Sequence, residues 1–223
     1  MQLYFVRHGE TEWNKEHRYY GKTDLPLNSK GEEQGKRIGA LLKDISFDMI
    51  YTSPLKRAIQ TKQFIINENH KKEVKELQSM CLSEQDLGIF EGYTYGEIEQ
   101  KFPNELQQWN QDFKSAPHGG ESFYDFYDRI YHFCTEILEV EGLAYRGTEK
   151  RNIVELGQRL QVPKKRENEK VLIVSHMAVL RCIFTMLLGM QEDAVWNFTI
   201  EQGTYSRIDI EDGYAIVKKI NQS

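Results

Sequence analysis

Residues 3–14 read LYFVRHGETEWN, and this stretch decides how the whole chain is interpreted. Residues 3–6 are apolar and favour β structure, so they predict a buried strand that ends before Gly9. The apolar run stops at Arg7 and His8. A cation beside an imidazole is costly at the end of a buried strand unless an anion compensates it. The stretch therefore predicts an anion-binding site where the first strand ends.

The composition fits a single folded domain with a small ligand. The chain has 223 residues, of which 39% are hydrophobic and 12% aromatic, and its formal net charge is -5. This acidic balance lacks the basic surface expected of a protein that binds nucleic acid or an anionic membrane. No apolar run approaches the roughly 18 residues of a membrane span, and the charges near the N-terminus do not fit a signal peptide. We therefore expect a cytoplasmic protein.

Capping signals predict where the helices begin. Ser29 with Glu32 forms a capping-box pattern at the start of a helix that runs to about residue 42. Ser53 as an N-cap and Pro54 at the first helical position predict a second helix, directly after a short strand at 47–53.

Two further helices follow in the middle of the chain. Thr94 with Glu97 predicts a short one, and Ser122 with Asp125 opens a long amphipathic one over residues 122–140. The aromatic residues of this longer helix recur at helical spacing, so we expect them in the core.

The strands predict a sheet that is mostly parallel. They are expected at residues 3–6, 47–53, 74–80 and 171–174, with a closing hairpin at 204–210 and 214–220. Strands that alternate with helices indicate an α/β fold in which helices cover both faces of the sheet. We interpret residues 1–223 as one domain with a charged surface insertion at about 142–170. A solvated loop is the favoured interpretation of this insertion, with a cap over the site or an interface left open.

Five chemically apt residues converge on one edge of this predicted sheet. They are Arg7, His8, Arg57, Glu84 and His176. Ligands of parallel sheets lie at the carboxyl ends of the strands, and helix N-termini there add partial positive charge. Two guanidinium groups and two imidazoles would hold a phosphoryl group, with the lone carboxyl as proton donor. A neutral histidine fixed through one ring nitrogen can attack phosphorus with the other.

Simpler interpretations exist for each residue alone. His176 could be a structural histidine and Glu84 a solvated loop acid. The presence of five such residues at one edge of the sheet would then have to be explained by several independent coincidences. A zinc site is disfavoured because the chain has no HxxxH pair or close His and Cys set, and Arg7 beside His8 opposes a cation. We therefore expect no metal.

The cysteines at 81, 134 and 182 are odd in number and lack CxxC spacing, so we expect reduced thiols within the core.

Several motifs together carry a family resemblance. VRHGETEWN, GKTDLPLNSKGEEQG, YTSPLKRAIQT, SEQDLGIFEG, GGES and VLIVSHMAVLR occur in this order over nearly the whole chain. They resemble the successive motifs of the histidine phosphatase superfamily, whose members are phosphoglycerate mutase-like. The resemblance implies a three-layer α/β/α sandwich with a mostly parallel central sheet. The acid motif is similar to that of the phosphatase branch, which includes enzymes acting on α-ribazole phosphate.

The resemblance also implies roles for individual residues. His8 would be the nucleophile that becomes phosphohistidine, and Glu84 the general acid that protonates the departing alkoxide. The other pocket residues would be Arg7, Arg57, His176, Asn14, Tyr20 and Gly21. Tyr20 departs from the family pattern, in which a glutamine often precedes this glycine.

The reaction type is the last expectation. A metal-independent phosphomonoesterase acting on a small phosphorylated metabolite, without a cofactor, is favoured. A cofactor-dependent mutase must hold a second anionic group, and the chain has no Arg-Arg pair for it. A catalytically silent phosphate-binding protein is the third alternative. The substrate's identity and the oligomeric state stay open, with a homodimer among the possible states.

Overall fold

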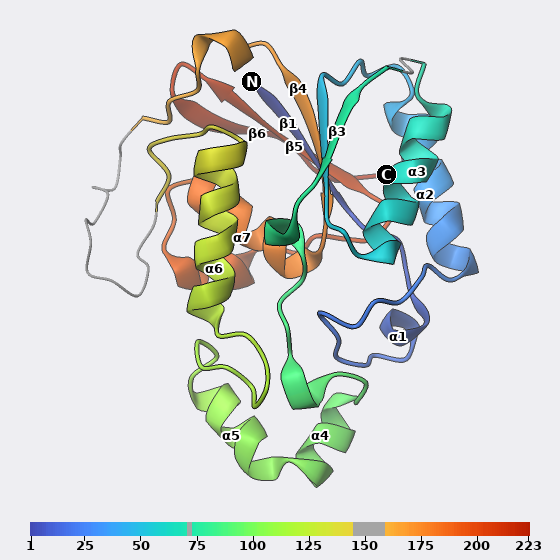
Figure 1. The fold of residues 1–223 in the computed structure, drawn as a ribbon, viewed down its shortest axis with the longest axis vertical. Coiled ribbons are helices and arrows are strands. Elements are labelled where there is room, and N and C mark those ends of the chain that lie inside the picture. The colour runs from blue at the N-terminus through green and yellow to red at the C-terminus, as the bar shows by residue number, and fades with distance from the viewer. Residues whose placement is uncertain (71–72, 145–158) are drawn as a thin grey trace.

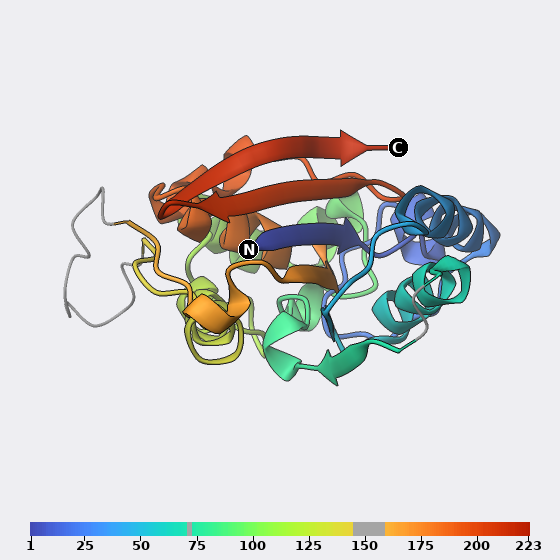
Figure 2. The same ribbon diagram turned by 90° about the horizontal axis from the view of Figure 1, so that it is seen from above.

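A computed structural model describes residues 1–70, 73–144 and 159–223. It has three layers, in which helices cover both faces of a six-stranded sheet (Figures 1 and 2). The strands are β1 (Gln2–Arg7), β2 (Met49–Thr52), β3 (Lys75–Gln78), β4 (Lys170–Ser175), β5 (Tyr205–Glu211) and β6 (Tyr214–Gln222). The α-helices are α1 (Glu12–Lys15), α2 (Ser29–Leu42), α3 (Lys56–Glu68), α4 (Tyr95–Lys101), α5 (Pro103–Gln111), α6 (Phe123–His132) and α7 (Met177–Leu187).

The sheet has the order β3-β2-β4-β1-β5-β6. The first four strands in this order pair in parallel, whereas β5 pairs antiparallel with β1 and with β6. Because parallel neighbours need a crossover connection, helices cover both faces of this part of the sheet. The predicted α/β/α sandwich with its mostly parallel sheet and closing hairpin is confirmed.

Strand register brings the predicted site residues to one level of the sheet. Arg7 at the end of β1 lies opposite Ser175 of β4, and Thr52 of β2 lies opposite Val174. The ladder continues one residue further, since the His8 amide donates to the Ser175 carbonyl at 2.9 Å. The residue that follows each strand therefore emerges at the same edge, where the polar side chains meet.

The central strands are buried on both faces. Tyr4 and Val6 of β1 pack in a cluster with residues of α2 and α3, whereas Leu3 and Phe5 pack on the opposite side with residues of α6 and α7. Side chains alternate across a strand, so a continuous apolar run serves both layers. Each such large side chain contributes about 1.5–3 kcal/mol of burial free energy, which makes the sheet a stiff support for the site.

Two helix starts differ from the sequence expectation. The N-cap of α2 is Asn28, whose side-chain oxygen accepts from the Gly31 amide at 2.8 Å, so Ser29 is already helical. Helix α3 begins at Lys56, later than predicted, and its N-cap lacks a side-chain hydrogen bond. Ser53 lies before the N-cap, which is Leu55, and its Oγ accepts from the Leu55 amide at 3.3 Å and lies 2.7 Å from Nε2 of His176. Ser53 therefore helps to hold the His176 ring, which is one of the predicted site residues.

The predicted caps of the two middle helices are confirmed. Thr94 forms a capping box with Glu97, and Ser122 accepts from the Asp125 amide. Helix α6 ends earlier than expected, because a π-helical turn, η3 (Phe133–Ile137), follows it. The aromatic stripe is buried as predicted except for Tyr131, which is half-buried, and Phe123 and Phe126 also line the cavity described below.

The charged insertion is described only in part. Residues 145–158, with most of the predicted periodic piece, lie outside the described residues. The rest is not a simple solvated loop. Arg166, in the 3-10 turn η4 (Lys164–Arg166), is buried and donates to the carbonyls of Ile137 and Leu138 at 3.2 and 3.0 Å. A guanidinium satisfies exposed carbonyls after the π-turn, which sequence charge alone does not reveal.

Two further expectations concern membranes and thiols. Within residues 1–70, 73–144 and 159–223, no helix combines the length and apolarity needed to cross a bilayer. All three cysteines are free, and Cys134 and Cys182 are buried as predicted. Cys81 is half-buried.

Candidate active site

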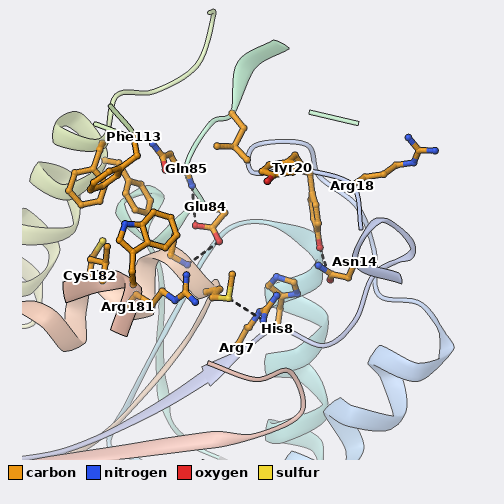
Figure 3. A pocket seen from close by; sticks show the side chains of 18 of the residues that line it. Arg7, His8, Asn14, Arg18, Tyr20, Glu84, Gln85, Phe113, Arg181 and Cys182 are labelled. Atoms are coloured by element: carbon orange, nitrogen blue, oxygen red, sulfur yellow. Dashed lines mark hydrogen bonds between the residues drawn. The ribbon is translucent and has the colours of Figure 1, made fainter. Parts of the chain in front are cut away.

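A cavity of about 620 Å³ opens at the carboxyl ends of β1, β2 and β4. Figure 3 shows its side chains, with His8, Arg7, Asn14 and Tyr20 at one end and Phe113 at the other. Most of the predicted site residues line it, namely Arg7, His8, Asn14, Tyr20, Arg57 and Glu84. His176 and Gly21 are close to these residues but are not part of the lining.

His8 has the tautomer required of a nucleophile. Its Nδ1 lies 2.7 Å from the carbonyl oxygen of Gly9, which can only accept, so Nδ1 carries the proton. Nε2 therefore holds the lone pair, and it has no hydrogen-bond partner among the described residues. Burial, and then the charges of Arg57 and Arg7, hold the pKa of His8 well below its usual value. The ring is neutral at pH 7 and available for attack.

Two arginines, the buried Arg57 and the half-buried Arg7, have no carboxylate partner in the described chain. Arg57 is fully buried and donates to the carbonyls of Thr23 and Gly21 at 2.8 and 2.7 Å. Arg7 donates to the Ile200 carbonyl at 2.9 Å, while its buried Nε finds no hydrogen-bond acceptor in the part of the chain that the structure describes. A buried charge is costly unless it is paired. This cradle is therefore electrostatically incomplete without an anion.

His176 is held in place by protein groups on both ring nitrogens. Its Nδ1 accepts from Nε of Arg57 at 3.3 Å, so in the neutral ring Nε2 carries the proton and donates to Ser53. Burial and the charge of Arg57 keep its pKa well below the usual value. The rings of His8 and His176 have centroids 5.0 Å apart. One anion could therefore contact both, with His176 exchanging one of its present partners.

Glu84 lies where a proton donor is needed. Its carboxyl oxygens accept from the amides of Gln85 and Ala178 at 3.1 and 3.3 Å. Burial raises the pKa of Glu84 despite these bonds and the nearby arginines. Arg129 of α6 fixes the loop from below by donating to the carbonyls of Ser83 and Glu84 at 2.7 and 3.1 Å. Glu84 is thus half-buried, with its carboxyl oriented and inclined to keep its proton.

The three residues predicted to contact the substrate have different positions. Tyr20 stacks on the Arg57 guanidinium at 4.6 Å, and its hydroxyl donates to Oδ1 of Asn14 at 2.7 Å. Because Oδ1 is occupied, Asn14 has only its amide hydrogens for a ligand. Gly21 lies behind Arg57 and holds it through a carbonyl. A Cβ on Gly21 would lie 1.5 Å from the carbonyl oxygen of Gln85, so this close approach requires glycine.

Glu91 is a positioning residue that sequence reasoning missed. One carboxyl oxygen accepts from the amides of Gly21 and Lys22 at 3.0 and 2.8 Å, and the other accepts from the Thr23 amide at 2.8 Å. The carbonyls of this same loop hold Arg57. The sequence signal was an unassigned acid inside the SEQDLGIFEG motif.

The far end of the cavity was also missed. Arg181 of α7 lines it, although it lies within an otherwise apolar helix, MAVLRCIFTML. A single cation in such a helix is the signal that could have identified it. Two aromatic residues of the lining, Phe123 and Phe126, were predicted as core residues, and periodicity cannot distinguish a core face from a cavity wall.

The donor set fits an anion and not a cation. The described residues contain no group of three or more His, Cys, Asp or Glu side chains arranged to bind a metal ion. Two guanidinium groups beside the imidazoles would also repel a metal ion, whereas they match the oxygens of a phosphoryl group. The fold and site together define an α/β protein with a phosphoryl-binding site built around a nucleophilic histidine.

Comparison with known proteins agrees with this class. A family model described as "Histidine phosphatase superfamily (branch 1)" matches residues 3–143 and 155–223. The chain belongs to this superfamily and is one of its phosphatases.

Its relatives cover the whole chain. The chain is 29% identical to phosphoserine phosphatase 1 of Hydrogenobacter thermophilus, covering 99% of this chain and 92% of the relative. It is 31% identical to the adenosylcobalamin/alpha-ribazole phosphatase of Salmonella typhimurium, covering 99% and 96%. A solved structure described as a putative alpha-ribazole-5'-P phosphatase from Escherichia coli is similar with a TM-score of 0.82 and 27% identity, covering 100% and 96%. The predicted family is therefore confirmed.

Proposed function

We propose that this phosphatase hydrolyses a small phosphomonoester through a phosphohistidine at His8, without a metal ion. The single observation that carries the proposal is the His8 ring, whose Nδ1 is engaged by the Gly9 carbonyl while Nε2 has no hydrogen-bond partner among the described residues and faces the cavity that Arg7 and Arg57 also line. A nucleophile fixed within a ring of positive charge is the arrangement that phosphoryl transfer needs.

The first step forms the phosphoenzyme. Nε2 of His8 attacks phosphorus and forms the N–P bond, while the bond from phosphorus to the ester oxygen breaks. Arg7 and Arg57 stabilise the equatorial oxygens, whose charge is already matched by fixed donors. Glu84 gives its proton to the departing alkoxide, for which the raised pKa of its carboxyl is suited.

The second step regenerates the enzyme. Glu84 is now a carboxylate and accepts a proton from water as that water attacks the phosphohistidine. The N–P bond breaks, inorganic phosphate leaves, and His8 regains its lone pair. The proton given up in the first step is thereby restored, so the cycle balances without any other reactant.

The test combines turnover with chemical trapping. We expect phosphate release from at least one of a panel of phosphomonoesters in the presence of EDTA, and an acid-labile, base-stable phosphoenzyme after rapid quenching with labelled substrate. Peptide mapping should place the label at His8. Loss of all turnover with EDTA, or a label elsewhere, would contradict the proposal. Isomerisation of 3-phosphoglycerate only when 2,3-bisphosphoglycerate is added would instead indicate a mutase.

A further inference from the structure

The cavity continues well beyond the phosphoryl site. Opposite His8 it is bounded by aromatic side chains from α5, α6, the segment between them and the 3-10 turn η5 (Glu192–Asn197), as Figure 3 shows around Phe113. We call this set the aromatic wall: Trp109, Phe113, Phe123, Phe126 and Trp196. Phe113 contacts Phe123 and Trp196 edge to face, with centroids 5.1 and 5.5 Å apart. Such a wall favours a flat, apolar ligand.

Arg181 supplies a cation at this end. Its Nε donates to the Phe198 carbonyl at 2.6 Å, and its guanidinium lies 5.6 Å from the Trp196 ring centroid. The two terminal nitrogens have no acceptor among the described residues, and within that part of the chain Arg181 forms no ion pair. Figure 3 shows its side chain on the same side of the cavity as Glu84. The fixed Nε leaves the terminal nitrogens free to bind a ligand.

The charges of the cavity do not balance without a second anion. A phosphomonoester dianion is matched by Arg7 and Arg57. In the proposed reaction Glu84 begins protonated, a state that the raised pKa of its carboxyl favours, so in this proposal it does not neutralise Arg181 before the proton is transferred. Arg18, which also lines the cavity, is already paired with Glu16 and Glu97 at 2.6 and 2.7 Å. The Arg181 charge is therefore left for the leaving group.

We propose that the leaving group is an aromatic alcohol that carries a carboxylate, with its ring against the aromatic wall and its carboxylate on Arg181. This inference rests on the proposed function, because the same Glu84 protonates the alcohol oxygen. A cavity of about 620 Å³ accommodates a phosphorylated ring with one substituent, since ligand pockets of this kind span about 300–1,000 Å³. Arg181 thereby selects the substrate without contacting phosphorus.

The test uses substrates that differ only at the distal group. Benzyl phosphate, its 3- and 4-carboxy derivatives and the matching carbamoyl derivatives have similar leaving groups, because the methylene insulates the ester oxygen from the substituent. We expect wild-type kcat/KM for one carboxybenzyl phosphate to exceed that of its carbamoyl partner by about tenfold or more, as for a charge-assisted hydrogen bond. Arg181→Met should remove this preference and leave benzyl phosphate within about twofold.

The matched control is Arg37→Met. Arg37 of α2 also donates a single hydrogen bond to a carbonyl, that of Gly203 at 2.8 Å, but it is exposed and does not line the cavity. This variant should keep the full carboxylate preference. A second variant, Phe113→Leu, should lower kcat/KM for carboxybenzyl phosphate and not for 5-carboxypentyl phosphate, which has no ring to stack.

Each other outcome has a defined meaning. Equal wild-type kcat/KM for carboxy and carbamoyl substrates, or a preference that survives Arg181→Met, would overturn the inference. An equal loss on every substrate with a shifted basic limb of the pH profile would also overturn it, because Arg181 would then act through Glu84. Turnover of p-nitrophenyl phosphate but of no benzyl phosphate would again overturn only this inference. The absence of any turnover and of phosphohistidine would overturn the proposed function itself.

Discussion

The two ends of the cavity are built in different ways. At the phosphoryl end, the side chains follow strands in register, and Arg57 is 0% exposed with three donor nitrogens bonded to the protein. At the leaving-group end, the side chains come from helices and connecting segments, and Trp196 is 57% exposed. The difference indicates that the sheet positions the chemistry, whereas peripheral elements set selectivity. Substitutions at the two ends should therefore have different signatures.

The largest effect is expected for His8→Ala. Removing the nucleophile should lower kcat by more than about a thousandfold on every substrate, since no other described group at this position can form the N–P bond. Phosphate release and the acid-labile label measure this. A control, His70→Ala, removes an exposed histidine paired with Asp44 and should be fully active. Residual turnover in the His8 variant that still passes through a phosphoenzyme would show that another residue is the nucleophile.

Glu84→Gln should discriminate between leaving groups. We expect a loss of about a hundredfold or more on benzyl phosphate, whose alkoxide needs a proton, and a much smaller loss of the first step on p-nitrophenyl phosphate. Rapid-quench measurement of the p-nitrophenol burst isolates that step from hydrolysis of the phosphoenzyme. Equal losses in the burst rates of both substrates would remove Glu84 from the role of acid.

The pH profile gives a second measurement of the same residue. Because the pKa of Glu84 is raised, the acid form persists above the usual carboxyl range, and activity should fall as pH rises through that pKa. Because burial lowers the pKa of His8, loss of the nucleophile should occur only at low pH. In Glu84→Gln the basic limb should disappear while the acidic limb remains.

Glu91→Gln should disturb the phosphoryl end alone. Glutamine keeps one acceptor oxygen but replaces the other with a nitrogen that cannot accept, so either the Gly21 and Lys22 amides or the Thr23 amide lose their acceptor, and the loop that holds Arg57 should shift. We expect about a tenfold loss of kcat/KM, by the same factor for benzyl and carboxybenzyl phosphates. Glu99→Gln, at an exposed site on α4, is the matched control. If the loss of kcat/KM in Glu91→Gln differed between benzyl and carboxybenzyl phosphates, the phosphoryl end and the leaving-group end of the cavity would not act separately.

The smallest effects concern two glycines and are measured as stability. Gly21→Ala would force its Cβ against the Gln85 carbonyl and should cost about 1–3 kcal/mol of unfolding free energy. Gly96→Ala meets nothing within 4 Å in α4 and should gain about 0.5–1 kcal/mol. Urea denaturation distinguishes the opposite signs. Stabilisation by Gly21→Ala would mean that the loop is not held close to Gln85.

Residues next to strand ends could be predicted from the sequence. Two apolar runs, one before Arg7 and His8 and one before His176, each indicated a strand and the residue that follows it. This was possible because an apolar run and the point where it ends are visible in neighbouring residues of the sequence. Capping boxes were predictable for the same reason at Thr94. At Ser53 the local signal placed the helix start too early, because α3 begins at Lys56 and the Ser53 hydroxyl instead contacts His176, which is distant in sequence.

The sequence by itself therefore determined the family, the strands and most of the helices, and it singled out the residues that we propose to react, since each depends on neighbours along the chain. Only the tertiary structure decided which nitrogen of His8 is free, how Glu91 holds the loop behind Arg57, and that Arg181 enters the same cavity as Glu84. These facts depend on contacts between segments far apart in sequence. Such contacts follow from strand register and helix packing, which no local pattern encodes.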